Sequence, residues 1–248
     1  MESDFPPSTI HFRPVLTLEL HSHTHASGDC LMRPADIVRT CERKGLQRLA
    51  VTDHDTLRGA LELRDLAPEL VIVGEEIMTT QGELLAYFVT EEIPPGLSPA
   101  ETIARLRAQG AAISVSHPFD RLRKGAWREA DLAAILPLVD AIEVFNARCI
   151  YPEDNARALA FAQDHAKLGT VGSDAHSHRE LGRAALRVER APATGAELVA
   201  AFATGERLTR LSSPAIHFTS TFAKHWKRLA GQVGNLPHTD KRNPPSGE

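Results

Sequence analysis

The sequence contains little that would mark a secreted, membrane-bound or disulfide-stabilised protein. Its 248 residues include three cysteines, Cys30, Cys41 and Cys149, which are too few and too scattered for a disulfide framework or a zinc knuckle. We interpret them as small buried hydrophobic residues in a reducing compartment, so we expect a cytoplasmic protein. No apolar run approaches the length of a membrane span, and the N-terminus lacks a basic segment followed by an apolar one.

The sequence also lacks an excess of positive charge. It has 28 Lys and Arg against 32 Asp and Glu, and the formal net charge is −4, so it has no basic field typical of a general nucleic-acid binder. Aromatic residues make up only 5% of the chain, and no stretch interleaves them with basic residues as a groove for nucleic acid would require. We therefore expect no obligate nucleic-acid partner and no membrane partner, while the oligomeric state stays open.

The bulk composition is that of an α/β protein with a full core. The chain is 42% hydrophobic and 24% charged, which is ordinary for a globular domain, and its length fits one large domain or two small ones. Short apolar segments alternate with helical segments, which predicts parallel βα units. A turn at 81–82 precedes another strand over 83–90. We expect an irregular lead-in over 1–14, one domain over 15–230 and a mobile tail over 231–248.

The stretch that organises the chain follows the first predicted strand. Hydrophobic and polar residues alternate over 15–20, and His21, His23 and His25 then recur at every second residue. Residues two apart share a face of an extended backbone, so His21 and His23 can point both imidazoles at one spot. Asp29 can return to that spot after a Ser-Gly turn. A buried core histidine would explain one such residue, whereas spaced histidine and carboxylate groups are what divalent metals require.

Other predicted strands end in residues of the same kind, namely His54, Glu76, His117, Asp174 and His176. In barrels of parallel strands the carboxyl ends of the strands share one rim, where functional sites are built. Imidazole together with carboxylate suits manganese, iron or zinc better than calcium. About eight candidate ligands exceed what a single metal ion can use, so we expect two or three divalent ions.

The charge balance of such a site indicates its substrate. Three divalent ions would bring about six positive charges, and Asp29, Glu76 and Asp174 would neutralise three of them. The remaining charge favours an anionic substrate and lowers the pKa of a bridging water, so that metal-bound hydroxide exists near neutral pH. This predicts phosphoester hydrolysis with that hydroxide as nucleophile, because no Ser or Cys has a base at motif spacing. The leaving-group acid is not identifiable from the sequence.

Four segments, in this order, resemble the motifs of the PHP family, which is named for polymerase and histidinol phosphatase. They are residues 21–24 (HSHT), 52–55 (TDHD), 116–118 (SHP) and 172–176 (GSDAH). The segments 82–83, 93–98, 117–120 and 143–148 more closely resemble small stand-alone PHP hydrolases of bacteria. The resemblance implies a distorted (β/α)7 barrel, with a metal site at the carboxyl ends of the strands.

The resemblance also implies which residues bind up to three metals. Glu76 would bridge the first and second ions, and Asp29 stands where some relatives have His. Many relatives supply a histidine to the second ion where this chain has Glu83. Glu83 either binds this ion or does not bind it, and we favour binding. The implied ligands are His21, His23, Glu76 and Asp174 for the first ion, Glu76 and His117 for the second, and Asp29, His54 and His176 for the third.

Several arginines follow predicted strands and could bind phosphate. We favour Arg148, just past a strand end, and Arg183, a few residues after the last motif. The basic loop from Arg121 to Lys124, which includes Arg123, is either a phosphate-binding loop or a solvated one.

The C-terminal part of the predicted domain contains one amphipathic segment. Phe218, Phe222, Trp226 and Leu229 recur at helical spacing, with three cations elsewhere on the helix, Lys224, Lys227 and Arg228. We predict a closing helix that packs its apolar face on the barrel and points these cations outward.

Together these features predict an enzyme, a metal-dependent phosphoesterase of the hydrolase class. Its substrate would be a small phosphorylated molecule, such as a nucleotide or a phosphorylated sugar or amino-acid precursor. Two alternatives stay open: an exonuclease that acts on nucleic-acid ends, and a non-catalytic PHP domain that binds metal structurally or serves as an interaction module. Amide hydrolysis on a similar multi-histidine barrel has no specific support in the sequence.

Overall fold

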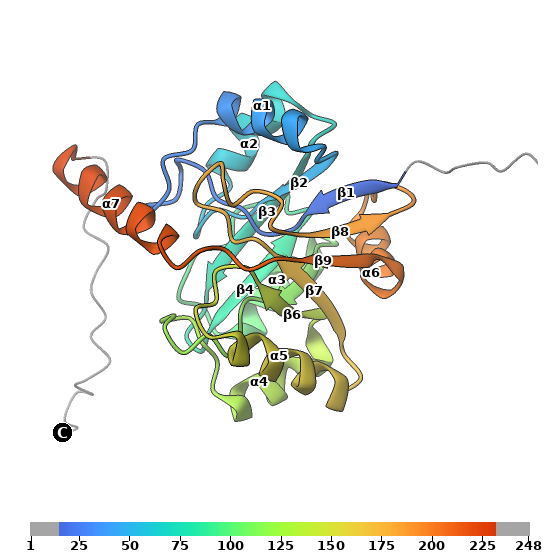
Figure 1. Ribbon diagram of the computed structural model, residues 1–248. Helices are drawn as coiled ribbons and strands as arrows, with labels where there is room; N and C mark the ends of the chain where they lie inside the picture. The colour runs from blue at the N-terminus through green and yellow to red at the C-terminus, as the bar shows by residue number, and fades with distance from the viewer. Residues whose placement is uncertain (1–14, 232–248) are drawn as a thin grey trace, which may run out of the picture.

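One curled sheet, built from the short apolar runs of the sequence, forms the centre of the molecule (Figure 1). The computed structural model describes residues 15–231. The predicted lead-in over 1–14, and the predicted tail beyond 231, lie outside the described residues. Within residues 15–231 the sheet has nine strands, in the order β7-β6-β5-β4-β3-β2-β1-β8-β9. Their bounds are β1 (Leu16–Glu19), β2 (Arg48–Val51), β3 (Val71–Met78), β4 (Glu83–Tyr87), β5 (Ala112–Val115), β6 (Ala141–Asn146), β7 (Leu168–Gly172), β8 (Ala184–Val188) and β9 (Glu206–Thr209).

The strand directions only partly follow the predicted parallel βα units. The strands β1, β2 and β3 are parallel to one another, as are β5, β6 and β7. The prediction is wrong for β4, which is antiparallel to both its neighbours, and for β8, which is antiparallel to β1 and β9. A parallel neighbour needs a long crossover, but only a tight turn joins β3 to β4, where Thr79 N–H donates to the Gly82 carbonyl over 3.0 Å.

The two ends of the sheet return toward each other and nearly close a barrel. Ser22, just after β1, forms a parallel bridge with Ala175, just after β7. The Ala175 carbonyl accepts from His23 N–H over 3.0 Å, and Ala175 N–H donates to the His21 carbonyl over 3.3 Å. The predicted fold class, an α/β fold with a barrel-shaped sheet, is therefore confirmed, and its closure brings the first and last motifs side by side.

The helices begin and end at the signals that the sequence provides. Pro34, Pro99 and Pro152 lie in the first turns of α1, α3 and α5, where the missing N–H costs no hydrogen bond. The Ser98 side chain accepts from Glu101 N–H and caps α3, and Gly45 ends α1 with a left-handed φ of 66°. The helices are α1 (Pro34–Lys44), α2 (Arg58–Leu66), α3 (Pro99–Ala108), α4 (Glu129–Ile135), α5 (Pro152–Asp164), α6 (Gly195–Thr204) and α7 (Ile216–Leu229), with a short 3₁₀ turn over Leu136–Leu138.

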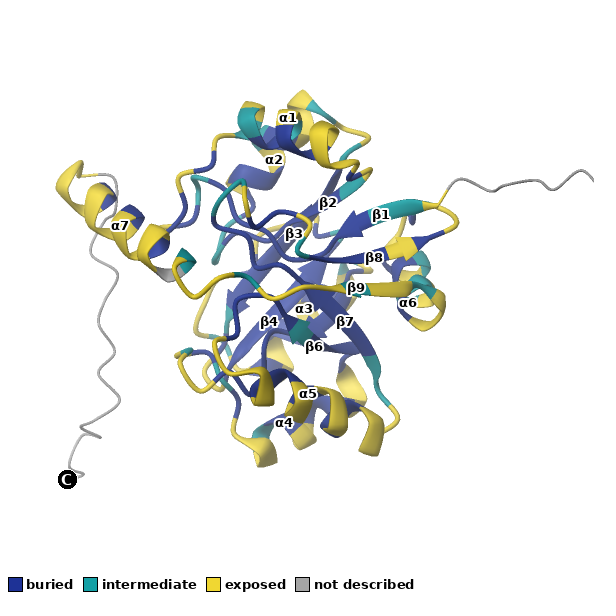
Figure 2. Ribbon diagram, viewed as in Figure 1, coloured by how far each residue is buried: buried dark blue, intermediate teal, exposed yellow. Residues whose placement is uncertain are grey.

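Alternate residues of the central strands belong to two different hydrophobic cores. Val71 and Val73 pack toward the surrounding helices, while Ile72 between them packs inside the barrel. Helix α6 adds Phe202 to the inner core, where its ring lies edge-on to Tyr87 with centroids 6.1 Å apart. Figure 2 shows the buried strands at the centre and the exposed outer faces of the helices. Among residues 15–231, none of the helices combines the length and the hydrophobicity that crossing a bilayer would require.

Helix α7 does not pack as predicted. Its large apolar side chains face solvent: Phe218 is 78% exposed and Phe222 is 61% exposed, and Trp226 and Leu229 are exposed as well (Figure 2). The helix instead buries Lys227, whose ammonium donates to the His25 and Ser27 carbonyls over 2.5 and 2.6 Å. These two carbonyl partners compensate the burial of the charge. The expected orientation of α7 is wrong, because the apolar face is exposed and Lys227 is buried.

We predict that Gly172→Ala destabilises the protein by about 1–3 kcal/mol, because a Cβ at this position would lie 2.4 Å from both the Cβ of His21 and a Glu143 oxygen. Gly28→Ala is the matched control, since a Cβ there meets nothing within 4 Å, and we expect a change within about 0.5 kcal/mol. Urea unfolding followed by circular dichroism measures both. Equal stability of the two variants would show that β7 does not constrain His21.

Candidate metal centre

The nine side chains predicted as metal ligands lie together at one end of the barrel. Most of them follow the carboxyl ends of strands, while Glu76 lies within β3 and Glu83 opens β4. Each has a nitrogen or oxygen atom within 3.8 Å of such an atom in another member. We call this set the cluster: His21, His23, Asp29, His54, Glu76, Glu83, His117, Asp174 and His176.

The first group within the cluster is the most deeply buried. The Nε2 atoms of His21 and His23 lie 3.2 Å apart. His21 Nε2 is 3.3 Å from Glu76 Oε2, and His23 Nε2 is 3.2 Å from Asp174 Oδ1. Asp174 holds a left-handed backbone conformation with φ of 51°, which is uncommon outside glycine and is typical of strained functional positions.

The second group shares Glu76 with the first. Its other oxygen, Oε1, lies 3.1 Å from His117 Nε2, and Glu83 Oε2 lies 3.6 Å from the same nitrogen. The hairpin between β3 and β4 pairs Glu83 with Met78, two residues along β3 from Glu76, and so brings Glu83 to this group. Gly125 backs the Glu83 carboxylate so closely that a Cβ would lie 2.1 Å from Oε2. The Glu83 carboxylate therefore belongs to the second group, and its ligation of a metal ion stays a prediction.

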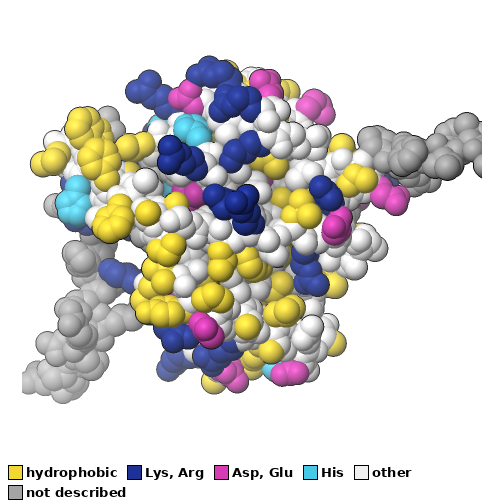
Figure 3. All heavy atoms as spheres, in the orientation of Figure 1, with side chains coloured by type: hydrophobic (Ala, Val, Ile, Leu, Met, Phe, Trp, Pro, Cys, Tyr) yellow, Lys and Arg dark blue, Asp and Glu magenta, His cyan; other side chains and the backbone are white. Residues whose placement is uncertain are grey.

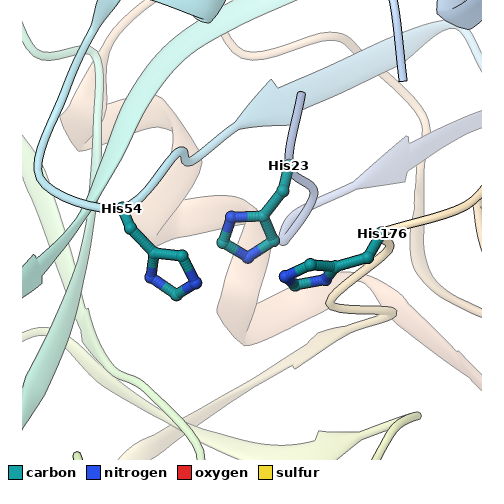
Figure 4. Close-up of side chains that lie close together, drawn as sticks. All are labelled: His23, His54 and His176. Atoms are coloured by element: carbon teal, nitrogen blue, oxygen red, sulfur yellow. The ribbon is translucent and has the colours of Figure 1, made fainter. Parts of the chain in front are cut away.

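The third group lies around Asp29. Its Oδ1 atom is 3.1 Å from His176 Nε2 and 3.7 Å from His54 Nε2. Figure 4 shows the rings of His23, His54 and His176 converging from three different segments. His54 Nδ1 is also 3.1 Å from Glu76 Oε2, so the third group is continuous with the other two.

Neighbouring side chains hold the outer nitrogens of the two strand-end histidines and so aim Nε2 inward. His21 Nδ1 lies 2.9 Å from Glu143 Oε1, and His23 Nδ1 lies 3.1 Å from Ser27 Oγ. Ser27 Oγ donates to Asp53 over 2.5 Å, so Asp53 supports an imidazole through Ser27. Glu143 was not predicted, although a glutamate inside an apolar strand was a signal that it had a buried partner.

The cluster contains acceptors that no described group satisfies. Across residues 15–231, Asp29 Oδ1, Glu76 Oε2, Asp174 Oδ1 and His176 Nε2 are buried without a hydrogen-bond partner. Carboxylate oxygens in this state are costly unless a cation compensates them. In addition, three sets of three side chains each offer ligand atoms within 4.8 Å of one another, among them His21, His23 and Glu76. The donor set therefore fits divalent metal ions.

The pKa shifts show how negative this environment is. Burial would lower the pKa of His54, but Glu76 and Asp29 raise it to about 10. Burial would raise the pKa of Asp174, but Arg123 and His21 hold it well below its usual value. Burial and the charge of Glu76 raise the pKa of Glu83, because two carboxylates face each other. A cation between them would relieve this repulsion.

The arginine beside the cluster is Arg123, from the loop after β5. Its guanidinium forms an ion pair with Asp174, and its Nε lies 3.6 Å from Asp120 Oδ2. From the sequence this loop is expected to be either phosphate-binding or solvated, because its composition does not indicate that it folds back. Trp127 N–H closes the loop by donating to the Pro118 carbonyl over 2.8 Å.

The two arginines favoured from the sequence make other contacts. Arg148 is buried, with Nε 3.3 Å from Glu180 Oε1 and a hydrogen bond to Ser220 of α7. Arg183 donates to the Leu211 carbonyl over 3.2 Å. Their assignment as phosphate-binding residues stays a prediction, and the direct contact with the cluster belongs to Arg123.

Comparisons with known proteins identify the family. Residues 19–122 match the model of the PHP domain, and residues 152–206 match a PHP-associated model. The uncharacterized protein MJ1587 of Methanocaldococcus jannaschii is 39% identical over 143 residues, which cover 52% of this chain and 81% of that protein. The chain belongs to the PHP family. A second protein of that organism, the uncharacterized protein MJ0417, is 34% identical over 176 residues, covering 69% of this chain and 70% of its own.

Solved structures share the PHP fold at low sequence identity. PsfC from Pseudomonas syringae has a TM-score of 0.62 at 18% identity, over 86% of this chain and 98% of its own. A candidate metal-dependent phosphoesterase from Bifidobacterium adolescentis has a TM-score of 0.54 at 19% identity, over 65% of this chain and 88% of its own. The lesion-specific endonuclease PfuEndoQ from Pyrococcus furiosus has a TM-score of 0.56 at 19% identity, over 79% of this chain and 57% of its own. The resemblance to the PHP family is thus confirmed, and the expected hydrolase class agrees with it.

We predict that manganese raises the melting temperature of the protein, because it would pair the buried carboxylates, and that His23→Ala weakens this effect. A ligand at a hundred times its Kd stabilises by about 2.7 kcal/mol. His25→Ala is the matched control, since His25 lies two residues away and pairs instead with Glu62 over 3.2 Å. Thermal unfolding with and without metal, together with elemental analysis, measures the effect. An unchanged shift in His23→Ala would remove this residue from the metal centre.

Proposed function

We propose that this PHP-family protein is a metal-dependent hydrolase of phosphate esters and that its substrate is a small phosphorylated molecule. The observation that carries the proposal is the set of carboxylate oxygens that accept no hydrogen bond and lie buried among imidazoles, directly beside the permanent cation Arg123. Similar folds are described for a candidate metal-dependent phosphoesterase and for an endonuclease, and both descriptions concern phosphoester bonds.

In this proposal the cluster holds two or three divalent ions of manganese, iron or zinc. When bound, such ions supply Lewis acidity for the phosphate oxygens and lower the pKa of water. Glu76 is suited to bridging, because its two oxygens face different groups. We propose His21, His23, Glu76 and Asp174 as the first group of ligands, Glu76, Glu83 and His117 as the second, and Asp29, His54 and His176 as the third.

Residues of the chain itself position the phosphate and exclude water. The side chains of His54 and Arg123 are 27% and 20% exposed, whereas Asp174 and Glu76 are almost completely buried. A phosphate therefore reaches the cluster on the side where His54 and Arg123 meet solvent. Arg123 offers planar donors that suit phosphate oxygens, and Glu143 keeps His21 oriented through its outer nitrogen.

Two other functions compete with this proposal. The similarity in fold to PfuEndoQ keeps a nuclease in consideration, but the net charge of −4 favours a small anion over a polyanion. A non-catalytic interaction module would bind metals without hydrolysing any ester. Activity measured together with metal content separates all three functions.

We predict that the metal-loaded protein hydrolyses phosphomonoesters and that Arg123→Gln lowers kcat/KM by about 10- to 100-fold, as expected when one hydrogen bond to a charged group is lost. Arg121→Gln is the matched control from the same loop, because Arg121 is exposed and pairs with Asp154 over 2.6 Å. The panel contains phosphomonoesters, nucleotides and labelled oligonucleotides, each with manganese, iron or zinc.

Certain results from the same panel would contradict the proposal. Hydrolysis of oligonucleotides alone would make the protein a nuclease, and full metal loading without hydrolysis of any member would make it a binding module. Equal effects of the two arginine substitutions would exclude Arg123 as a phosphate contact.

A further inference from the structure

An apolar groove of about 370 Å³ lies where α7 meets the rim of the metal centre. Phe218 and Phe222 line it from α7, and Leu31 and Met32 line it from the segment that follows Asp29. Its volume is in the range typical of small-molecule sites. The groove has no carboxylate, lysine or arginine among its lining residues, so it suits an uncharged group.

The groove and the metal centre share His176. This residue is among those that line the groove, and its Nε2, on a completely buried side chain, lies 3.1 Å from Asp29 Oδ1 in the third group of the cluster. A molecule held at both places would have an anionic end at the cluster and an apolar end against Phe218 and Phe222. The same segment contributes to both, because Asp29 belongs to the cluster and Leu31 to the groove.

Polar contacts fasten α7 to the metal-site loop and keep its aromatic side chains in place. Lys227 donates to the carbonyls of His25 and Ser27, and Lys224 Nζ lies 3.4 Å from Asp29 Oδ2. Consequently the apolar side chains of α7 stay exposed beside the site, and Figure 3 shows them gathered at the left edge of this face. Contiguous exposed aromatic side chains next to a charged centre are typical of ligand binding.

We propose that this groove binds the organic group of the substrate and that this group is aromatic. The inference rests on the proposed function, since the phosphate would occupy the metal centre. It makes α7 a determinant of specificity, with Phe218 and Phe222 as the contacts. Leu229 is exposed on the same helix but does not line the groove, so it distinguishes a substrate groove from a general apolar docking face; Trp226 does not, because its ring stacks on Phe222 with centroids 6.1 Å apart.

The test compares phenyl phosphate with ethyl phosphate, and phenylphosphonate with methylphosphonate, on the metal-loaded protein. The two esters also differ in the reactivity of their leaving groups, which affects their rates of hydrolysis. The phosphonates are not hydrolysed, so calorimetry on them measures binding alone. We expect phenylphosphonate to bind at least about tenfold more tightly than methylphosphonate, as is typical for filling an apolar pocket. Phe222→Ala and Phe218→Ala should each reduce this preference several-fold, and Leu229→Ala should leave it unchanged.

The kcat/KM ratio of phenyl to ethyl phosphate should fall in parallel in the two phenylalanine variants, relative to the wild-type ratio. An unchanged phosphonate preference in Phe218→Ala and Phe222→Ala would overturn the inference, as would an equal loss in Leu229→Ala, which would indicate a general docking face. If neither these esters nor any other member of the panel is hydrolysed, the proposed function fails, while the phosphonate measurement still decides whether the groove binds the aromatic group.

Discussion

Buried carboxylates at the rim of a barrel, each with one oxygen that accepts no hydrogen bond, are the constraint on which the rest of this structure depends. Asp29, Glu76 and Asp174 each keep an oxygen that no described residue between 15 and 231 satisfies. Such groups persist in a folded protein when a cation compensates them. The imidazoles that converge on the same oxygens provide nitrogen ligands for such a cation, so the electrostatics and the ligand chemistry lead to the same conclusion.

The barrel is what brings these groups together from distant parts of the chain. Its closure through Ser22 and Ala175 brings the segment after β1 against the segment after β7, although about 150 residues separate them in sequence. Gly172 allows the two segments to approach, and the antiparallel hairpin before β4 turns Glu83 toward Glu76. On this rim α7 places an apolar surface beside a charged centre, held there by Lys227.

The site was more predictable from the sequence than its surroundings were. Histidines and carboxylates at successive strand ends predict one cluster, because strand ends share a rim in any barrel of this type. Arg123 was not distinguished from its loop, since its position depends on how the chain turns back after β5. The orientation of α7 was predicted wrongly because helical periodicity does not say which face packs; two backbone carbonyls buried Lys227 instead. Strand β9 (Glu206–Thr209) was missed because its mostly exposed residues show no apolar alternation.

Crystals of protein purified without chelator and supplied with manganese would test the central claim most directly, through anomalous difference density. The account predicts at least two peaks at the barrel rim, each within bonding distance of Glu76 or Asp29, with Glu76 touching more than one ion. A map without peaks beside these carboxylates, or with manganese bound only elsewhere on the surface, would contradict it.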